Sequence, residues 1–494
     1  MKIENEIVEL YKEIYPVYAF MQGISECRGK IFIPSKTNRK KVIRKINLLL
    51  KQARDKKHLI ILKSLKYKLE LYKPYQFVNG LGSYLFNYEM KKTSVSEILP
   101  DLKEGVRILI KEDTKMPIGI RILCAMGIDN AIVGLKKMSK DGELIYLLKR
   151  YRAKLNINFE LNRENILHNF KKNSLGRKKE YKKYLNGVMG VPEAPRKIEK
   201  LCLKWLRLTL SEFNLVADKI KKKYNLSDVG EIDKFLLEKS GKNLLKTADE
   251  WRKKLRLPIE KNLLEISKRH KVKYIITPDY LESKLPIAAA SAMNYLSGDF
   301  ENILFLTKKA KINDYFLVDI LVHEEFGHNV NFSNSLDSNI LDRLIFLPTM
   351  YPTAEIIATY LEYRFFELSK KLNLGRKFDL FYSYVVFKRF LIVYLRAIAD
   401  IRINTGKNSF AEFLEWANNE TGINKDSLFH DIFGKFFIPG YATAYPLGMH
   451  ALENLRKKSN INEKEFNTKV WSLGLPPFSV FLDSAKKIGK EFKK

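Results

Sequence analysis

Cysteine is scarce in this chain of 494 residues, which contains three, at Cys27, Cys124 and Cys202. They are odd in number, far apart and never in a C-x-x-C pair, so we do not expect a disulfide framework. The N-terminal residues also lack the basic and then apolar pattern of a secretory signal. Both features favour a cytoplasmic location.

Long uncharged hydrophobic runs are missing as well. The most apolar long run, residues 381–398, is interrupted by Lys388, Arg389 and Arg396. A helix that spans a bilayer needs about 20 predominantly apolar residues, so this run predicts a buried helix, and we expect no transmembrane segment. Glycine and proline number only 24 and 16, and 46% of the residues are hydrophobic, which argues against a disordered chain.

Acidic residues are few beside the 89 Lys and Arg: there are 56, and the net charge is +33. The excess is densest between Arg28 and Lys73, where the acids are Asp55 and Glu70 alone. Such charge attracts the phosphates of nucleic acid, or an acidic partner. Because no nucleic-acid-binding motif accompanies it, solvated lysine-rich surfaces explain the charge better.

The pattern of apolar residues predicts a mainly α protein with a small β-sheet beside the metal-binding helix described below. Residues 1–190 form a basic, mostly helical N-terminal region, and the glycines and prolines of residues 187–195 mark a boundary. Residues 191–494 form the second region. β-Branched and aromatic residues predict two strands, at 270–278 and 300–307. Helices are predicted over 197–224, 377–404, 409–421 and 426–437. A pair of helices is predicted to end at Leu257-Pro258.

The stretch His323-Glu324-Glu325-Phe326-Gly327-His328 has the residues of a metal hydrolase. Neutral imidazoles bind zinc, and a carboxylate beside the first can take a proton from water at the metal. The usual signature, H-E-x-x-H, places both rings on one helix face through a four-residue step. Here the step is five residues, H-E-x-x-G-H.

This extra residue changes the geometry. On a regular α-helix five residues turn about 500°, so the two rings would point about 140° apart. A π-type turn brings them together, and Gly327 tolerates the unusual backbone angles that widening requires. Three interpretations stay open: His323 and His328 as ligands, which we favour, Glu324 and His328 as ligands, or two histidines with structural hydrogen bonds only.

A third ligand is expected on the following helix, which we predict to have Thr353 as its N-cap and to run from Ala354 to about Leu372. Glu355, 27 residues after His328, is the favoured ligand. Glu362, two turns on, is the alternative ligand, or an acid that supports one. A glutamate in the first helical turn is also favoured by the helix dipole alone.

Two tyrosines, Tyr441 and Tyr445, lie in the glycine-containing stretch 439–450. A tyrosine there could donate a hydrogen bond to the oxyanion formed as water attacks a peptide carbonyl. Taken alone, both are more typical of packing residues.

Four segments resemble, in the same order, motifs of the domain-of-unknown-function 885 family, a group similar to the zinc-dependent gluzincin peptidases. Residues 323–329 are similar to H-E-x-x-P-G-H-H without the proline, and residues 355–362 to E-G-W-A-L-Y-A-E. Residues 396–404 are similar to R-L-x-x-D-x-G-x-H, with Asn404 in place of the histidine. Residues 439–448 are similar to P-G-Q-A-x-x-Y-K-x-G, with Tyr441 in place of the glutamine.

The resemblance covers residues 190–458, and the H-E-x-x-G-H form is also similar to the motif of dipeptidyl peptidase III. The helical setting is similar to thimet oligopeptidase and the Taq-type carboxypeptidases, which implies a two-lobed, zincin-like fold. The resemblance implies the zinc ligands His323, His328 and Glu355, the base Glu324, and the cleft residues Arg396, Asp400 and Tyr445.

We therefore predict a zinc metallopeptidase with one Zn²⁺ per chain that hydrolyses short peptides, as a carboxypeptidase or an oligopeptidase. Arg396 would bind a peptide carboxylate or pair with Asp400. The alternative is a catalytically inactive relative that binds nucleic acid or an acidic partner through its basic N-terminal half. The oligomeric state cannot be predicted from the sequence.

Overall fold

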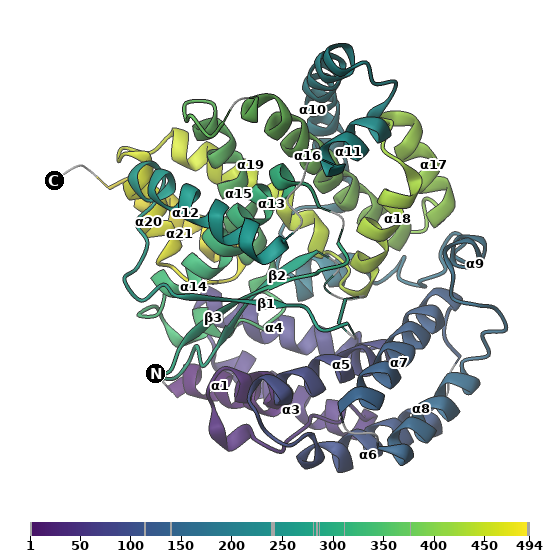
Figure 1. Cartoon of the computed structure of the whole chain (residues 1–494). Helices are drawn as coiled ribbons and strands as arrows, with labels where there is room; N and C mark the ends of the chain where they lie inside the picture. Colours follow the sequence, from purple (N-terminus) through teal and green to yellow (C-terminus); the bar gives the residue numbers. More distant parts are fainter. Residues whose placement is uncertain are drawn as a thin grey trace.

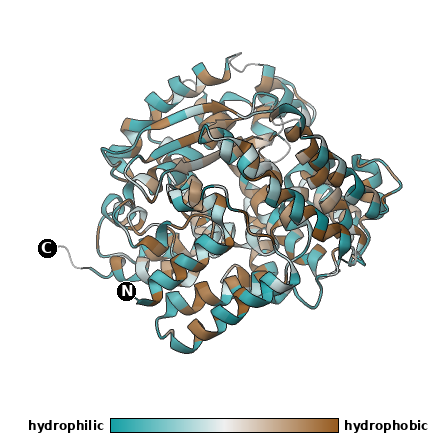
Figure 2. Ribbon diagram, turned by 90° about the horizontal axis from the view of Figure 1, so that it is seen from below, coloured by the Kyte–Doolittle hydropathy of each residue, from teal (hydrophilic) through white to brown (hydrophobic). Residues whose placement is uncertain are grey.

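The structure, a computed structural model, describes residues 2–112, 115–138, 141–238, 243–279, 281–282, 285, 287–310, 312–375 and 377–491. Across these residues the protein is mainly helical, with one sheet of three strands. The predicted helical class and the small sheet are both confirmed. Hydrophobic and hydrophilic residues alternate along the helices (Figure 2), as amphipathic helices around a core require.

The N-terminal helices are drawn in purple to blue in Figure 1. Side chains cap several of them: Ser35 Oγ accepts from the N–H of Asn38 at 3.1 Å, and Asp55 accepts from the N–H of Lys57 at 2.8 Å. Such caps satisfy backbone donors that the first helical turn leaves free. The helices are α1 (Lys2–Ile14), α2 (Pro16–Met21), α3 (Lys36–Gln52), α4 (Lys56–Glu70), α5 (Tyr75–Met90), α6 (Leu99–Lys111), α7 (Ile118–Met138), α8 (Gly142–Lys154) and α9 (Arg163–Asn169).

By length and composition alone, α7 could cross a membrane, with a hydropathy of 1.6. Buried helices inside a protein pass the same test, and 61% of its most apolar window is buried. It packs closely on α5, since a Cβ on Gly127 would lie 3.1 Å from the backbone nitrogen of Asn79. The helix is therefore weak evidence for a membrane span.

Strands β1 (Val272–Ile276), β2 (Ala288–Met293) and β3 (Glu301–Leu306) form the sheet in the order β1-β3-β2. The central strand β3 is parallel to β1 and antiparallel to β2. β1 and β2 are therefore the two edge strands. β1 and β3 lie where the sequence predicts strands, whereas β2 is not predicted. Because side chains alternate across a strand, Ile303 and Phe305 contact Met21 and Phe86 of the N-terminal helices, while Leu304 joins the main core.

Most of the remaining helices lie on the other side of the sheet from α1 and α3 in the view of Figure 1. The helix predicted to end at Leu257-Pro258 continues to Asn262, whose side chain donates to the carbonyl of Pro258 at 2.8 Å. The helices are α10 (Pro195–Tyr224), α11 (Val229–Glu238), α12 (Leu244–Asn262), α13 (Asp314–Leu321), α14 (Val330–Asn334), α15 (Met350–Ser369), α16 (Phe378–Asn404), α17 (Phe410–Thr421), α18 (Lys425–Phe433), α19 (Ala444–Lys457), α20 (Glu463–Trp471) and α21 (Phe478–Gly489).

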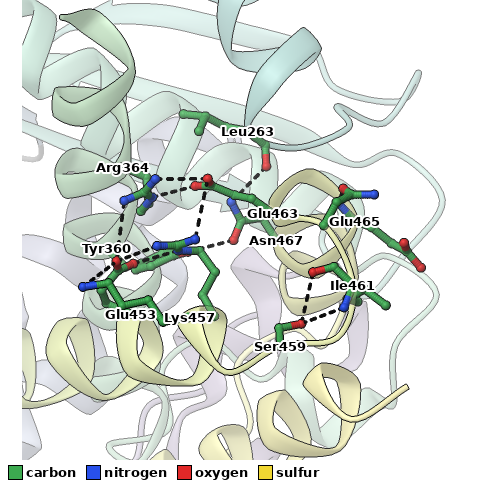
Figure 3. Close-up of polar contacts among 12 residues, drawn as sticks. Leu263, Tyr360, Arg364, Glu453, Lys457, Ser459, Ile461, Glu463, Glu465 and Asn467 are labelled. Carbon is green, nitrogen blue, oxygen red and sulfur yellow. Dashed lines mark hydrogen bonds and ion pairs between the residues drawn. The ribbon is translucent and has the colours of Figure 1, made fainter. Parts of the chain in front are cut away.

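An ion-pair cluster joins α15, α19 and α20 (Figure 3). Arg364 on α15 donates to Glu463 on α20 at 2.6 Å and lies 3.6 Å from Glu453 on α19. Glu453 also accepts from Arg456 at 2.7 Å. These contacts fix α15, the helix that carries Glu355, against its neighbours.

Buried contacts also join the two predicted regions. Arg177 Nη1 donates to Asn404 Oδ1 at 2.9 Å, and the N–H of Asn294 donates to the carbonyl of Met21 at 3.0 Å. The main core of buried apolar residues extends from Ile7 to Ile488. The boundary near residue 190 stays a prediction.

Candidate metal centre

Both motif histidines lie on a π-helix, η4 (Val322–Asn329), which continues α13 without a break. This wider turn brings the two rings to a centroid distance of 4.8 Å, with their planes at 87°. On a regular α-helix they would point about 140° apart. The π-type turn predicted from the five-residue step is therefore confirmed.

The sequence suggested that Gly327 is needed for unusual backbone angles, but the structure gives a different reason for a glycine at this position. Its backbone is not in the left-handed region. A Cβ at this position would instead lie 2.7 Å from the Cα of Ala358 on α15, a distance that real Cβ atoms do not adopt. Glycine is needed because the π-helix and α15 approach each other closely, and this approach brings Glu355 to the histidines.

Glu355 lies on α15, which begins one turn earlier than predicted. The helix starts at Met350 after Thr349, and Thr353 is inside it, where its hydroxyl donates to the carbonyl of Pro476 at 2.6 Å. The prediction of Thr353 as N-cap is wrong because Pro352 is accommodated in the first turn, where a helix tolerates proline. Glu355 therefore lies beyond the first turn, where the helix dipole alone would not favour it.

The potential ligand atoms of His323, His328 and Glu355 all lie within 4.8 Å of one another. Glu355 Oε2 is 3.3 Å from His323 Nε2 and 3.9 Å from His328 Nε2. Two ligands about 2.0–2.1 Å from a tetrahedral zinc ion are separated by roughly 3.3 Å. All three residues are at most 8% exposed.

Glu355 Oε2 is buried and has no hydrogen-bond partner in the structure. An isolated buried carboxylate oxygen is costly unless a cation or a donor satisfies it. Burial raises the pKa of Glu355, but the contact with His323 and the charge of His328 outweigh burial and lower it. Two imidazoles and a carboxylate are a common ligand set of catalytic zinc, so these residues fit the metal.

The second nitrogen of His323 is also held. Glu362 Oε1 lies 2.5 Å from His323 Nδ1, which leaves Nε2 directed toward Glu355. Such carboxylate–histidine pairs fix the ring orientation of metal ligands. Burial lowers the pKa of His323, but the charge of Glu362 and the contacts of the ring nitrogens with the Glu355 and Glu362 carboxylates outweigh it and raise the pKa to about 10. Burial lowers the pKa of His328.

Glu324 is separate from these ligands. Its Oε2 accepts a hydrogen bond from the N–H of Ala290, on the edge strand β2, at 2.7 Å. The residue is half-buried, unlike its neighbour His323. In the described residues the converging group includes His323 and omits Glu324, which does not support the alternative in which Glu324 and His328 are the ligands.

A chain of two tyrosines reaches Glu355. The hydroxyl of Tyr445 donates to that of Tyr441 at 2.9 Å, and Tyr441 donates to Glu355 Oε1. Burial raises the pKa of both hydroxyls well above its usual range, so both stay protonated donors. The resemblance pointed to Tyr445, and sequence reasoning missed the direct contact of Tyr441.

Lys435 is a further residue that sequence reasoning missed. Its Nζ lies 5.4 Å from the ring centroid of Tyr441 and 5.7 Å from that of Tyr445. Burial lowers its pKa to about 7. No sequence motif marks this lysine, because it comes from the short helix η6 (Gly434–Phe437) and reaches the tyrosines only through the fold.

Arg396 binds Asp431, and the pair that we considered between Arg396 and Asp400 does not form. Asp400 instead accepts from the N–H of Gly440 at 2.8 Å and from Asn404 Nδ2 at 2.7 Å. Burial raises the pKa of Asp400 to about 7. Because Asn404 also accepts from the buried Arg177 at 2.9 Å, this part of the third motif belongs to a structural network.

A scan against protein-family models finds no match, and a search of curated proteins finds no similar sequence. Two solved structures share the fold along nearly the whole chain. One, described as a putative lipoprotein from Colwellia psychrerythraea, is 13% identical with a TM-score of 0.64, covering 99% of this chain and 99% of that one. The other, described as a putative lipoprotein of unknown function from Shewanella oneidensis, is 16% identical with a TM-score of 0.67, covering 97% and 98%. At these identities the likeness concerns the fold alone.

Proposed function

We propose that the protein is a zinc metallopeptidase that hydrolyses short peptides, with one zinc ion held by His323, His328 and Glu355. The observation that carries this proposal is the unpartnered, buried Oε2 of Glu355, which faces the Nε2 atoms of both histidines. The resemblance to the domain-of-unknown-function 885 family, and through it to two-lobed zincin-like peptidases, supports the same function.

When bound, zinc would supply Lewis-acid chemistry, polarising a peptide carbonyl and lowering the pKa of water. The half-buried Glu324 would accept the proton of the attacking water and return it to the leaving amine. Tyr445, which stays protonated, would turn its hydroxyl from Tyr441 to donate a hydrogen bond to the developing oxyanion, while Tyr441 keeps its hydrogen bond to Glu355. Glu362 would hold His323 in the orientation that exposes Nε2.

The edge strand β2 offers a place for an extended peptide. The N–H groups of Ala290 and Asn294 point away from β3, to Glu324 and to Met21. Alternate residues of an antiparallel edge strand present their backbone groups in the same direction, so the half-buried Ala288 would be free to pair with a substrate strand. Pairing here would place the peptide beside Glu324.

Two cations bear on the choice between carboxypeptidase and oligopeptidase. Lys435 lies against both tyrosines, and among the described residues its Nζ has no ion pair. Arg396 is neutralised by Asp431. If the peptide ends at this position, Lys435 is therefore the better placed of the two to meet its carboxylate.

The experiment is the substitution Glu324→Gln, assayed with peptides that have free and blocked ends. Zinc content should stay near that of the wild type, whereas hydrolysis should fall by about 10³-fold or more, because the base is removed and the ligands remain. Glu301→Gln, at an exposed position of β3, is the matched control and should retain activity. Hydrolysis retained by the Glu324→Gln variant would contradict the assignment of Glu324 as the base.

The alternative, an inactive relative that binds nucleic acid or an acidic partner through residues 1–190, has its own outcome in this experiment. It predicts no hydrolysis by the wild type and salt-sensitive binding of labelled nucleic acid. The cytoplasmic location also stays a prediction, supported by three buried, free cysteines.

A further inference from the structure

A basic groove lies on α10, away from the residues of the metal centre. It has a volume of about 710 Å³ and is bounded by one face of α10, by the end of α16 and by Lys407. Volumes of roughly 300–1,000 Å³ are typical of small-molecule sites. The groove is lined by Arg196, Glu199, Lys200, Leu203, Lys204, Arg207, Leu208, Ser211, Arg402 and Lys407.

Four of the cations form a stripe on α10. Arg196, Lys200, Lys204 and Arg207 are separated by four, four and three residues, which places them on one helical face over roughly 16 Å. All four are exposed. Among the described residues, their side chains have no hydrogen bond or ion pair. Like charges four residues apart destabilise a helix, so the stripe has a cost that an anionic ligand would offset.

The opposite wall is held in place. Glu199 accepts from Arg402 at 2.6 Å and from Lys407 at 2.7 Å. The Arg402 guanidinium also lies 4.2 Å from the ring centroid of Trp416. Glu199, the acid in the lining, is thus already paired with this wall and leaves the stripe on α10 without a counter-charge. Two fixed cations therefore face four free ones.

The chemistry of the lining selects the ligand. Six cations along one open groove favour a compact molecule with several phosphates, since Arg and Lys are the usual phosphate partners. The lining contains no aromatic residue, and single-stranded nucleic acid relies on aromatic stacking. We propose that this groove binds a small molecule or lipid headgroup that carries more than one phosphate.

The test uses the full chain and inositol 1,4,5-trisphosphate as the probe, with calorimetry at about 150 mM salt to screen general attraction. The charge-reversal variant Lys200→Glu/Lys204→Glu should lower the affinity by about tenfold or more. The matched control, Lys219→Glu/Lys222→Glu, makes the same charge change at exposed positions of α10 outside the groove. It should lower the affinity by less than about threefold, because distant charges are screened.

The source of the phosphates is decided by sedimentation with phosphatidylcholine vesicles that contain a few per cent of phosphatidylinositol 4,5-bisphosphate. Binding to vesicles that is lost in the groove variant assigns a lipid headgroup, and binding to the soluble probe alone assigns a free phosphorylated compound. The proposal is overturned if the probe does not bind, if both variants lose affinity equally, or if an RNA oligonucleotide binds and the probe does not compete with it.

Discussion

Two neighbouring glutamates on the π-helix have opposite surroundings. Glu325 is 1% exposed and fully satisfied: it accepts from Arg252 at 2.8 Å and from Tyr274 at 2.5 Å, and His270 Nε2 is 3.4 Å away. Glu324 is half-buried and accepts one hydrogen bond, from the backbone of β2. The charge of Glu324 acts on His323 and His328, whose Nε2 atoms face the buried Oε2 of Glu355.

The difference teaches how to separate structural from functional polar groups in this fold. A buried carboxylate with a full set of hydrogen-bond donors stabilises the native state and needs no further partner. A buried carboxylate oxygen that faces two imidazoles, without a hydrogen bond of its own, is suited to hold a metal ion with them. The same helix therefore has a closed polar network on one side and the candidate metal centre on the other.

The largest expected effect follows from Gly327→Ala, which disrupts both sides. The added Cβ would meet the backbone of Ala358, so the π-helix and α15 must separate. We expect a loss of about 3 kcal/mol of stability, at the upper end for overpacking, together with loss of zinc. Thermal unfolding and elemental analysis measure both. Gly434→Ala, where a Cβ meets nothing within 4 Å, is the control and should be neutral or slightly stabilising.

Glu325→Gln separates the two sides. The substitution leaves Arg252 and His270 facing an amide, so we expect a loss of about 2–3 kcal/mol of stability with zinc content unchanged. Glu324→Gln should do the reverse, with a change in stability within about 0.5 kcal/mol and loss of hydrolysis. If both variants had the same profile in unfolding and activity, the comparison would fail.

Glu362→Gln should have a smaller effect on metal binding, together with a loss of stability, because Arg389 Nη2, 3.7 Å from Glu362 Oε1, then faces an amide. The amide holds His323 less well than the carboxylate, so the zinc dissociation constant should rise by about 10–100-fold, while one zinc per chain still binds at saturation. A competition titration with a chelator measures this change. Glu367→Gln, on the exposed part of the same helix, should leave the affinity unchanged, and an equal loss there would contradict the role of Glu362.

The smallest effect is expected for Glu453→Gln, and the pH dependence of its stability tests the ion-pair account. Burial raises the pKa of Glu453, but hydrogen bonding from Arg456 and the charge of Arg364 outweigh it, so the folded pKa is lowered. Its stabilisation is therefore present above the unfolded value of about 4.3 and is lost as pH falls through the folded pKa. We expect Glu453→Gln to cost about 1–2 kcal/mol at neutral pH and almost nothing at strongly acidic pH, measured by denaturant unfolding. A cost independent of pH would contradict the ion-pair account.

Much of this architecture could be predicted because the relevant signals are local. The five-residue step between the histidines required a widened turn, and the β-branched residues of 272–276 and 301–306 indicated strands. The helix over 378–404 followed from its apolar periodicity. Each of these patterns lies within a short window of sequence.

The rest depended on contacts between distant segments. β2 is built of Ala, Ser and Met, which do not favour strands, and it forms because it pairs with β3. The partner of Arg396 is Asp431 and not Asp400, since the fold brings α18 to α16. Tyr441 contacts Glu355 only because the fold brings α15 and residues 441–445 together. In the same way, Lys435 lies against the rings of Tyr441 and Tyr445 only in the folded chain.

The most direct measurement is elemental analysis of the natively purified protein beside its His328→Ala variant. The account predicts one zinc ion per chain in the wild type and none in the variant, because His328 supplies one of three ligands. Absence of bound metal in the wild type after zinc has been supplied, or equal zinc in the variant, would contradict it.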